Sequence, residues 1–274
     1  MAAKPSKMTF QQFYKEIVDS GLCARCGACV VVCPRNALGY IDGKPVLISD
    51  CNDCGVCMLA CARYKPNQEE LERFVFGRVR RSDEVFGVYD QILAARSKDS
   101  EILYVCQDGG LVSSLVTWAL EKKVIDGAIV SAFDAETWLA KPTVIRSREE
   151  MLQCAGTRYT YSPNILKLKD LAGKGLKIAY VGTPCQILAL RKMQYNKLRK
   201  TVNPIVFCIG LMCHESYTYD GLMKQKIENE LNVKLDDITK INIKGKILVQ
   251  LKSGEVKEIS LKDAKIHVKP ECFY

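Results

Sequence analysis

Eight of the fourteen cysteines in this 274-residue chain form two runs with the same internal spacing. In each run the cysteines are separated by two, two and three residues, at Cys23, Cys26, Cys29 and Cys33 and again at Cys51, Cys54, Cys57 and Cys61. Pro34 follows the first run, whereas Ala62 occupies the matching position after the second. Two equal runs in succession indicate an internal repeat of short segments, each organised around thiol groups.

This spacing is typical of bacterial ferredoxins, in which four thiolates hold a [4Fe–4S] cluster. The fourth cysteine of each run then ligates the cluster of the other run. We therefore predict one cluster on Cys23, Cys26, Cys29 and Cys61, and a second on Cys51, Cys54, Cys57 and Cys33. A domain of this kind transfers single electrons, so the whole chain is expected to take part in redox chemistry.

Two other uses of paired cysteines fit less well. A disulfide framework would require an oxidising compartment, and no apolar segment of an export signal follows the charged residues Met1–Lys7. A zinc site closes with four ligands and usually combines two CxxC pairs, whereas each run here has three cysteines at this spacing and a fourth beyond them. The pattern therefore predicts a cytoplasmic protein whose thiolates bind metal.

Length, hydropathy and charge limit the classes of protein to which this chain could belong. The chain is long enough for two domains, and it lacks the run of about 18 apolar residues that predicts a membrane-spanning helix. Its formal charge of +9 would fall to about +5 with two bound clusters of about −2 each. The lysines are spread over predicted helices and strands, so we expect no nucleic-acid binding, although the charge could steer an anionic substrate or partner.

The predicted domains follow from the position of the cysteine runs. Residues 1–66 are predicted to form the ferredoxin-like domain, with a helix over 9–20, the repeat over 21–63 and short strands at 40–43 and 45–47. Residues 67–90 are charged, lack a regular period and are predicted to be a linker. Residues 91–274 are predicted to form a larger α/β domain with an antiparallel section, which makes the whole fold α+β.

The larger domain alternates predicted strands and helices. Strands are expected at 127–132, 176–181 and 204–212, and helices at 111–122, 185–195 and 218–231. Such alternation favours parallel βαβ pairing. Residues 238–259 instead alternate as strands around a hairpin turn at Ser253-Gly254, which predicts the antiparallel section.

Four segments of the larger domain together resemble the β-subunit family of coenzyme F420-reducing hydrogenases and F420H2 dehydrogenases. They are Gln107–Ser113, Ala155–Asn164, Gly182–Gln186 and Gly210–Cys213. The resemblance runs from about Gln91 to the end of the chain. With the ferredoxin domain in front, the chain looks like the electron-input subunit of an F420H2 dehydrogenase. The same pairing occurs in relatives that are fused to, or associated with, sulfite reductase.

The resemblance implies that the larger domain binds FAD. Gly109 and Gly110 precede a predicted helix, so that backbone N–H groups could approach the flavin diphosphate at the positive end of that helix. A polar loop between two helices is the alternative interpretation of the second segment. The predicted cofactor contacts are Asp108, Gly109, Gly110, Ser113, Thr157, Arg158, Tyr159, Ser162, Asn164 and Thr183.

The resemblance also implies a third [4Fe–4S] cluster. Its ligands in the family match Cys185, Cys213 and Cys272, and the expected fourth ligand would be residue 275. Either the chain is truncated, which is the favoured interpretation, or this third site is incomplete. Cys106, Cys154 and Cys208 have no assigned partner and are expected to be buried small residues.

The expected reaction follows from what each cofactor carries. Coenzyme F420 exchanges a hydride, clusters carry one electron, and FAD converts between the two. The acceptor would be a redox partner such as a hydrogenase, a formate dehydrogenase, a reductase or a membrane-bound dehydrogenase. No catalytic acid or base is required. Arg158 is the first candidate for the anionic tail of F420, followed by Lys141, Arg146, Arg191 and Lys192. The alternatives are a relative that reduces another substrate with ferredoxin electrons and a flavin-free relay subunit.

Overall fold

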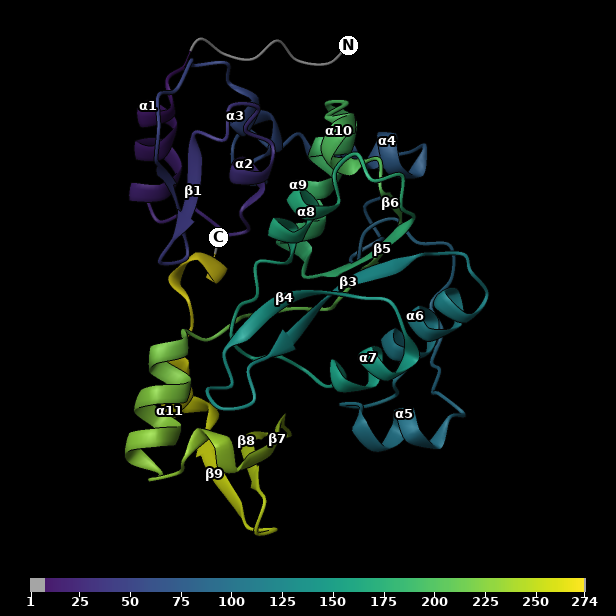
Figure 1. Cartoon of the computed structure of the whole chain (residues 1–274), viewed down its shortest axis with the longest axis vertical. Helices are drawn as coiled ribbons and strands as arrows, with labels where there is room; N and C mark the ends of the chain where they lie inside the picture. Colours follow the sequence, from purple (N-terminus) through teal and green to yellow (C-terminus); the bar gives the residue numbers. More distant parts are fainter. Residues whose placement is uncertain (1–7, 274) are drawn as a thin grey trace.

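The computed structural model describes residues 8–273, which fold into three connected parts (Figure 1). A small unit at the N-terminus lies above a central four-stranded sheet with helices on both of its faces. A three-stranded sheet with its own helices lies at the other end of the molecule. The fold is therefore a mixed α+β structure, as predicted.

The N-terminal unit contains the predicted first helix and the predicted strand pair. The helix is made of α1 (Phe10–Tyr14) and a π-helical continuation, η1 (Lys15–Asp19), and it begins with a capping box between Thr9 and Gln12. Strands β1 (Leu38–Ile41) and β2 (Lys44–Leu47) pair antiparallel. Helices α2 (Ala28–Val31) and α3 (Val56–Ala60) each contain the third cysteine of a run.

The segment predicted to be an irregular linker contains a helix, α4 (Gln68–Phe76), which is a correction to the expected lack of structure there. Leu71, Phe74 and Val75 stand at helical spacing in this segment, a signal that the sequence analysis missed. The ends of the helix are also marked, because the Asn67 side chain accepts a hydrogen bond from the Glu70 N–H and Gly77 ends the helix with a φ of +74°. Its buried Leu71 faces the protein, so the segment folds onto the central part.

The central sheet has the strand order β4-β3-β5-β6. Strands β3 (Gly127–Phe133), β5 (Ile178–Gly182) and β6 (Ile205–Gly210) are parallel, which confirms the predicted pairing. Strand β4 (Ala140–Ile145) was not predicted, and it pairs antiparallel with β3 at the edge of the sheet. Pro142 interrupts its sequence pattern, and an edge strand tolerates a proline because one side needs no ladder hydrogen bonds.

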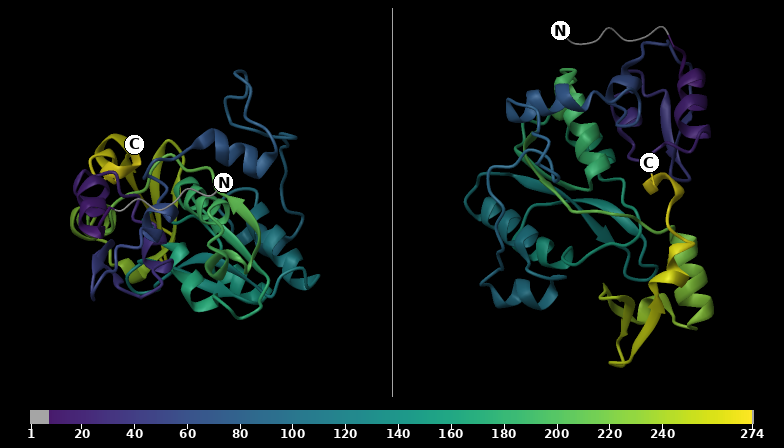
Figure 2. Two further views of the ribbon diagram at one scale, coloured as in Figure 1. Left: turned by 90° about the horizontal axis from the view of Figure 1, so that it is seen from above. Right: turned by 180° about the vertical axis from the view of Figure 1, so that it is seen from behind.

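Helices cover both faces of this sheet (Figures 1 and 2). On one face lie α5 (Ser100–Val105), α6 (Leu111–Glu121) and α7 (Arg148–Gln153). On the other lie η2 (Asn164–Lys167), α8 (Leu168–Leu171), α9 (Pro184–Tyr195) and α10 (Arg199–Val202). The predicted helices at 111–122 and 185–195 are therefore confirmed.

The N-terminal unit and the central sheet share one hydrophobic core. Ala28, Val31 and Ala60 from the cysteine-run helices belong to the same buried cluster as Leu190 and Met193 of α9. The contact surface is apolar and buried, so the N-terminal unit is fixed on α9 rather than tethered by a loose connection.

The C-terminal part is antiparallel, as predicted, with β7 (Ile238–Ile243), β8 (Lys246–Leu251) and β9 (Val256–Ser260) in sequence order. The predicted helix at 218–231 is present as the π-helix η3 (Asp220–Glu230). Shorter helices complete this part: η4 (Leu235–Asp237), α11 (Leu261–Lys265) and η5 (Pro270–Phe273). The last of these returns to the N-terminal unit, where Glu271 pairs with Arg25 (Figures 1 and 2).

Candidate functional site

The eight cysteines of the two runs surround two small cavities. One cavity is lined by Cys23, Cys26, Cys29 and Cys61, and the other by Cys33, Cys51, Cys54 and Cys57. The last cysteine of each run therefore faces the cavity of the other run. The structure brings together the same two sets of thiols that the sequence spacing assigns to two clusters.

The loops that carry the first cysteines of each run have the same backbone shape. Gly27 and Gly55 precede α2 and α3 with φ angles of +79° and +71°, a region where glycine is favoured because it has no Cβ. Arg25 and Asp53 also have positive φ, and each donates its backbone N–H to the sulfur two residues earlier, at 3.4 Å. The repeat seen in the sequence is thus a repeat in three dimensions, with N–H groups directed at the sulfurs.

The thiols of each set stand around a cavity. Among residues 8–273, no three His, Cys, Asp or Glu side chains converge as the ligands of a single metal ion do. Burial raises the pKa of Cys29 well above its ordinary value and that of Cys57 to about 12, so their thiolate forms require a compensating metal charge.

The two quartets differ in exposure. Cys26 and Cys29 of the first set are buried, whereas all four cysteines of the second set are partly exposed. A group held by the second set therefore lies nearer to solvent than one held by the first.

Cys185, Cys213 and Cys272 come together from three distant elements. Cys185 lies in the first turn of α9, Cys213 follows β6, and Cys272 lies in η5. Burial raises the pKa of Cys213, and the nearby sulfurs of Cys185 and Cys272 raise it further. Burial is also the main cause that raises the pKa of Cys26, and Cys185 is among the sulfurs that add to this effect. The third group of cysteines therefore adjoins the first quartet.

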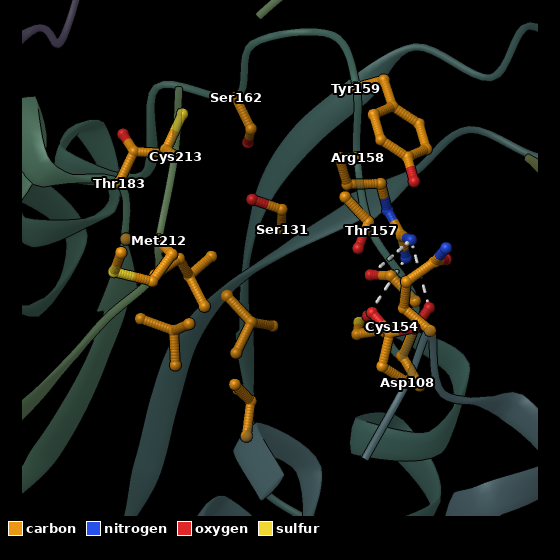
Figure 3. Close-up of a pocket in the computed structure, with 18 of the residues that line it drawn as sticks. Asp108, Ser131, Cys154, Thr157, Arg158, Tyr159, Ser162, Thr183, Met212 and Cys213 are labelled. Atoms are coloured by element: carbon orange, nitrogen blue, oxygen red, sulfur yellow. Dashed lines mark hydrogen bonds between the residues drawn. The ribbon is translucent and has the colours of Figure 1, made fainter. Parts of the chain in front are cut away.

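A cavity of about 650 Å³ lies between the central sheet and the C-terminal part, beside this third group (Figure 3). Its walls contain all ten residues predicted to contact a flavin: Asp108, Gly109, Gly110, Ser113, Thr157, Arg158, Tyr159, Ser162, Asn164 and Thr183. In Figure 3, Thr157, Arg158 and Tyr159 lie on one side of the space, and Thr183, Met212 and Cys213 lie on the other. A cavity of this size is within the range of cofactor sites.

Several lining residues were missed by the sequence analysis, among them Ser131, Gln186, Met212 and His214. Ser131 could have been found, because it lies near the carboxyl end of the predicted strand β3, where parallel sheets bind ligands. Nothing in the sequence around His214 marks that residue as part of the cavity wall.

Two helices begin at the cavity without a side-chain cap. Gly110 is the N-cap of α6 and Thr183 that of α9, and neither provides a capping hydrogen bond from its side chain. Their first-turn N–H groups make each helix start favourable for an anion or a thiolate. The α6 start fits a diphosphate, and Cys185 lies in the first turn of α9.

The two predicted glycines are also required by packing. A Cβ on Gly110 would lie 2.7 Å from Cγ2 of Ile102, and one on Gly109 would lie 3.0 Å from the carbonyl oxygen of Ala95. Gly110 in addition has a φ of +72°. A side chain at Gly110 would therefore disturb the contact between α5 and α6 before it obstructed any ligand.

The guanidinium of Arg158 is hydrogen-bonded to the protein backbone. It donates to the carbonyl oxygens of Cys154, Ala155 and Gly156, each at 3.1 Å (Figure 3). It also stacks on the ring of Phe133, with 4.5 Å between Cζ and the ring centroid. Burial lowers its pKa to about 10. This side chain therefore shapes the loop that forms one wall, and a role in binding an anionic ligand stays a prediction.

Asn164 has a similar organising role. Its Oδ1 accepts hydrogen bonds from the hydroxyls of Ser131 and Ser162, and its Nδ2 donates to the carbonyl oxygen of Val181. Gln186 joins the same network by donating to the carbonyl oxygen of Ser162. These buried polar groups satisfy one another and fix the floor of the cavity.

The remaining predicted positions lie elsewhere. Lys141, Arg146, Arg191 and Lys192, which were the further candidates for an anionic substrate, do not line the cavity. Lys192 instead points into the N-terminal unit. Cys106 and Cys154 are buried as expected, and Cys208 is only partly buried.

Two cysteine quartets, a third cysteine group and an adjoining cavity define an iron–sulfur redox protein. Comparison with known proteins identifies the family to which this chain belongs. Residues 92–169 match the N-terminal part, and residues 175–274 the C-terminal part, of the family described as coenzyme F420 hydrogenase/dehydrogenase, beta subunit. Residues 16–39 match a 4Fe-4S binding domain. The chain belongs to the coenzyme F420 hydrogenase/dehydrogenase β-subunit family, whose members are components of F420-linked oxidoreductases, and it carries a 4Fe-4S domain at its N-terminal end.

Individual relatives agree with this assignment. The chain is 40% identical over 192 residues to the beta subunit of the coenzyme F420 hydrogenase of Methanococcus voltae, a match that covers 68% of each protein. It is 32% identical over 272 residues to one of the subunits of the F(420)H(2) dehydrogenase of Methanosarcina mazei, covering 94% of this chain and 72% of that protein.

A solved structure is also similar. A chain in the F420-reducing [NiFe] hydrogenase complex from Methanosarcina barkeri matches with a TM-score of 0.60 and 37% identity, over 65% of this chain and 62% of that one. The present chain thus spans less than two thirds of that chain. No helix within residues 8–273 has the length and apolar character needed to cross a membrane.

Proposed function

We propose that this chain exchanges electrons between coenzyme F420 and a partner protein, by means of FAD in the 650 Å³ cavity and [4Fe–4S] clusters on the cysteine groups. One observation carries this proposal. Cys213 lies in the wall of the cavity and also belongs to the third cysteine group, which adjoins the first quartet. The cavity and the cysteine groups therefore form a continuous series.

The residues around the cavity fit a flavin dinucleotide. The uncapped start of α6 would hold the diphosphate, and Asp108, Thr157 and Tyr159 offer polar groups to the rest of the cofactor. When bound, the flavin would supply the conversion between a hydride and single electrons. The chain itself would orient the cofactor, because the polar network around Asn164 fixes the wall of the cavity.

The cysteine groups suit a path to the protein surface. The third group, with Cys185, Cys213 and Cys272, lies next to the cavity, and the first quartet, which is less exposed than the second, follows. The second quartet is the most exposed of the ferredoxin-type sites, so it is the proposed point of contact with a partner protein. The proposed partner is another component of an F420-linked hydrogenase, dehydrogenase or reductase complex.

Anaerobic mixing of the FAD-loaded protein with reduced coenzyme F420 tests this function. The absorbance of oxidised F420 should appear as the flavin and cluster absorbance bleaches. The reverse reaction should follow when chemically reduced protein is mixed with oxidised F420. If the protein binds FAD and both ferredoxin clusters, but neither the F420 absorbance nor the flavin and cluster absorbance changes on mixing, coenzyme F420 is not the substrate. That result would favour a relay protein.

A further inference from the structure

Lys192 joins α9 to the end of the second cysteine run. Its Nζ donates to the carbonyl oxygens of Cys61, at 2.7 Å, and of Tyr64, at 2.5 Å. One turn further along α9, Asn196 donates to the carbonyl oxygen of Leu59, at 3.1 Å. Three carbonyl groups at the end of α3 and after it are thus bound by side chains of one helix from the central part of the protein.

The ammonium of Lys192 is a buried charge. The residue is only 7% exposed, and the acceptors of its two hydrogen bonds are uncharged carbonyl oxygens. A buried charge is costly unless an opposite charge lies nearby. The Nζ of Lys192 lies 2.7 Å from the carbonyl oxygen of Cys61, so a cluster held by the Cys61 thiolate would lie next to this ammonium.

Arg25 and Arg35, which also lie near the quartets, are placed differently from Lys192. Arg25 lines the first cavity and shares the carboxylate of Glu271 with the buried Lys269, at 2.5 Å and 3.1 Å. Arg63 lines the same cavity and donates to the carbonyl oxygen of Glu271. Arg35 lines the second cavity and is exposed, so water and salt screen its charge. Within residues 8–273, Lys192 differs from Arg25 and Arg35 because it is buried and forms no ion pair with a carboxylate.

We propose that Lys192 is the positioning residue and internal counter-charge of the first cluster, and that it raises the reduction potential of this cluster. The proposal rests on the ligand sets proposed above. Gaining one electron makes a cluster one unit more negative, and a fixed buried cation stabilises that reduced state. No proton or other reactant is required for this effect.

An EPR-monitored redox titration of the intact protein tests the proposal. Lys192→Met removes the charge and keeps much of the side-chain length, so the first cluster should titrate at a more negative potential while the second stays unchanged. Lys192→Arg retains the charge and should retain the potential of the first cluster. Lys200→Met, at an exposed position on α10, is the matched control and should change neither cluster.

Iron content and EPR signals distinguish a variant that has lost a cluster from one whose clusters are intact. If Lys192→Met does not retain both clusters, Lys192→Gln keeps one hydrogen-bond donor and provides the uncharged comparison. Unchanged potentials in the uncharged variants, or equal shifts of both clusters, would overturn the role of Lys192. Absence of two cluster signals from the unmodified protein would instead contradict the proposed ligand sets.

Discussion

Arg25 Nε lies 2.5 Å from Oε1 of Glu271, although the two residues stand near opposite ends of the chain. Arg25 belongs to the first cysteine run, and Glu271 precedes Cys272 in η5. The Glu271 carboxylate is buried and also lies 3.1 Å from Nζ of Lys269. This ion pair holds the turn that carries Cys272 against the loop of the first quartet.

Replacing Glu271 should loosen that turn. Glu271→Gln keeps the shape of the side chain but leaves the cations of Arg25 and Lys269 without their carboxylate, at a cost of about 1–3 kcal/mol because Arg25 is partly exposed. Hydrogen exchange of residues 266–273 should become faster. Glu255→Gln, at an exposed carboxylate 3.9 Å from Lys257, is the control. Equal protection in both variants would show that the ion pair does not hold the turn.

The two cavities predict cross-ligation of the ferredoxin clusters. Cys33→Ser should damage the cluster that is otherwise held by the second run, and Cys61→Ser the cluster otherwise held by the first. Iron analysis and low-temperature EPR of each variant measure this. Loss of only the cluster of its own run in each case would show that the assignment is wrong.

A substitution at the start of α6 tests whether the diphosphate of FAD binds there. Leu111 is the first residue of α6, is 40% exposed and lines the cavity. Leu111→Asp favours the helix through its dipole but repels a diphosphate, so FAD affinity should fall about tenfold, or about 1.4 kcal/mol. Leu111→Asn has the same shape without the charge and should bind FAD more tightly than the Asp variant. Titration with FAD compares them, and equal affinities would place the diphosphate elsewhere.

We expect Arg158 to contribute more to the stability of the folded protein than to the binding of coenzyme F420. Arg158→Ala removes donors from three backbone carbonyl groups, and each such charged hydrogen bond contributes about 1.5–3 kcal/mol. Arg158→Lys keeps the charge but cannot reach all three acceptors, so it should rescue only part of the loss. Anaerobic thermal unfolding measures the effect. An unchanged Tm, together with weaker binding of coenzyme F420, would favour a direct substrate contact instead.

The buried carboxylate of Glu84 is expected to make the segment 67–87 sensitive to acid. Glu84 accepts hydrogen bonds from Arg78 and from the Arg81 N–H, which hold its pKa at about 2, below its ordinary 4.5. Because the folded pKa is depressed, this stabilisation is complete above about pH 4.5 and is lost as the pH falls through about 2.

Cleavage by pepsin across this pH range tests the effect. Cleavage within residues 67–87 should increase as the pH falls in the unmodified protein, whereas Glu84→Gln should be cleaved readily at every pH. Asp83→Asn, at an exposed carboxylate 3.4 Å from Arg81, should behave like the unmodified protein. The same pH profile for all three proteins would exclude Glu84 as the acid-sensitive group.

Strong local patterns made the main elements predictable. The apolar runs of β3 and β5, the alternation of 238–259 and the cysteine spacing each depend on neighbouring residues, which a sequence shows directly. The helix α4 has only a short apolar pattern among charged residues, and the pattern of the edge strand β4 is interrupted by Pro142. α4 depends on its Asn67 cap and a single buried Leu71, and β4 depends on pairing with β3. Contacts of that kind become visible only when the chain is folded.

The sequence by itself determined which atoms are available as ligands and how the loops that carry them turn, because cysteine spacing and glycines such as Gly27 and Gly55 act over a few residues. Only the tertiary structure decided what surrounds those ligands. It directed Arg158, a predicted ligand contact, to the backbone of its own loop, and it buried Lys192 of α9 beside Cys61. The physical reason is that charge and burial depend on residues that are distant in sequence and adjacent in space, and no local pattern records such neighbours.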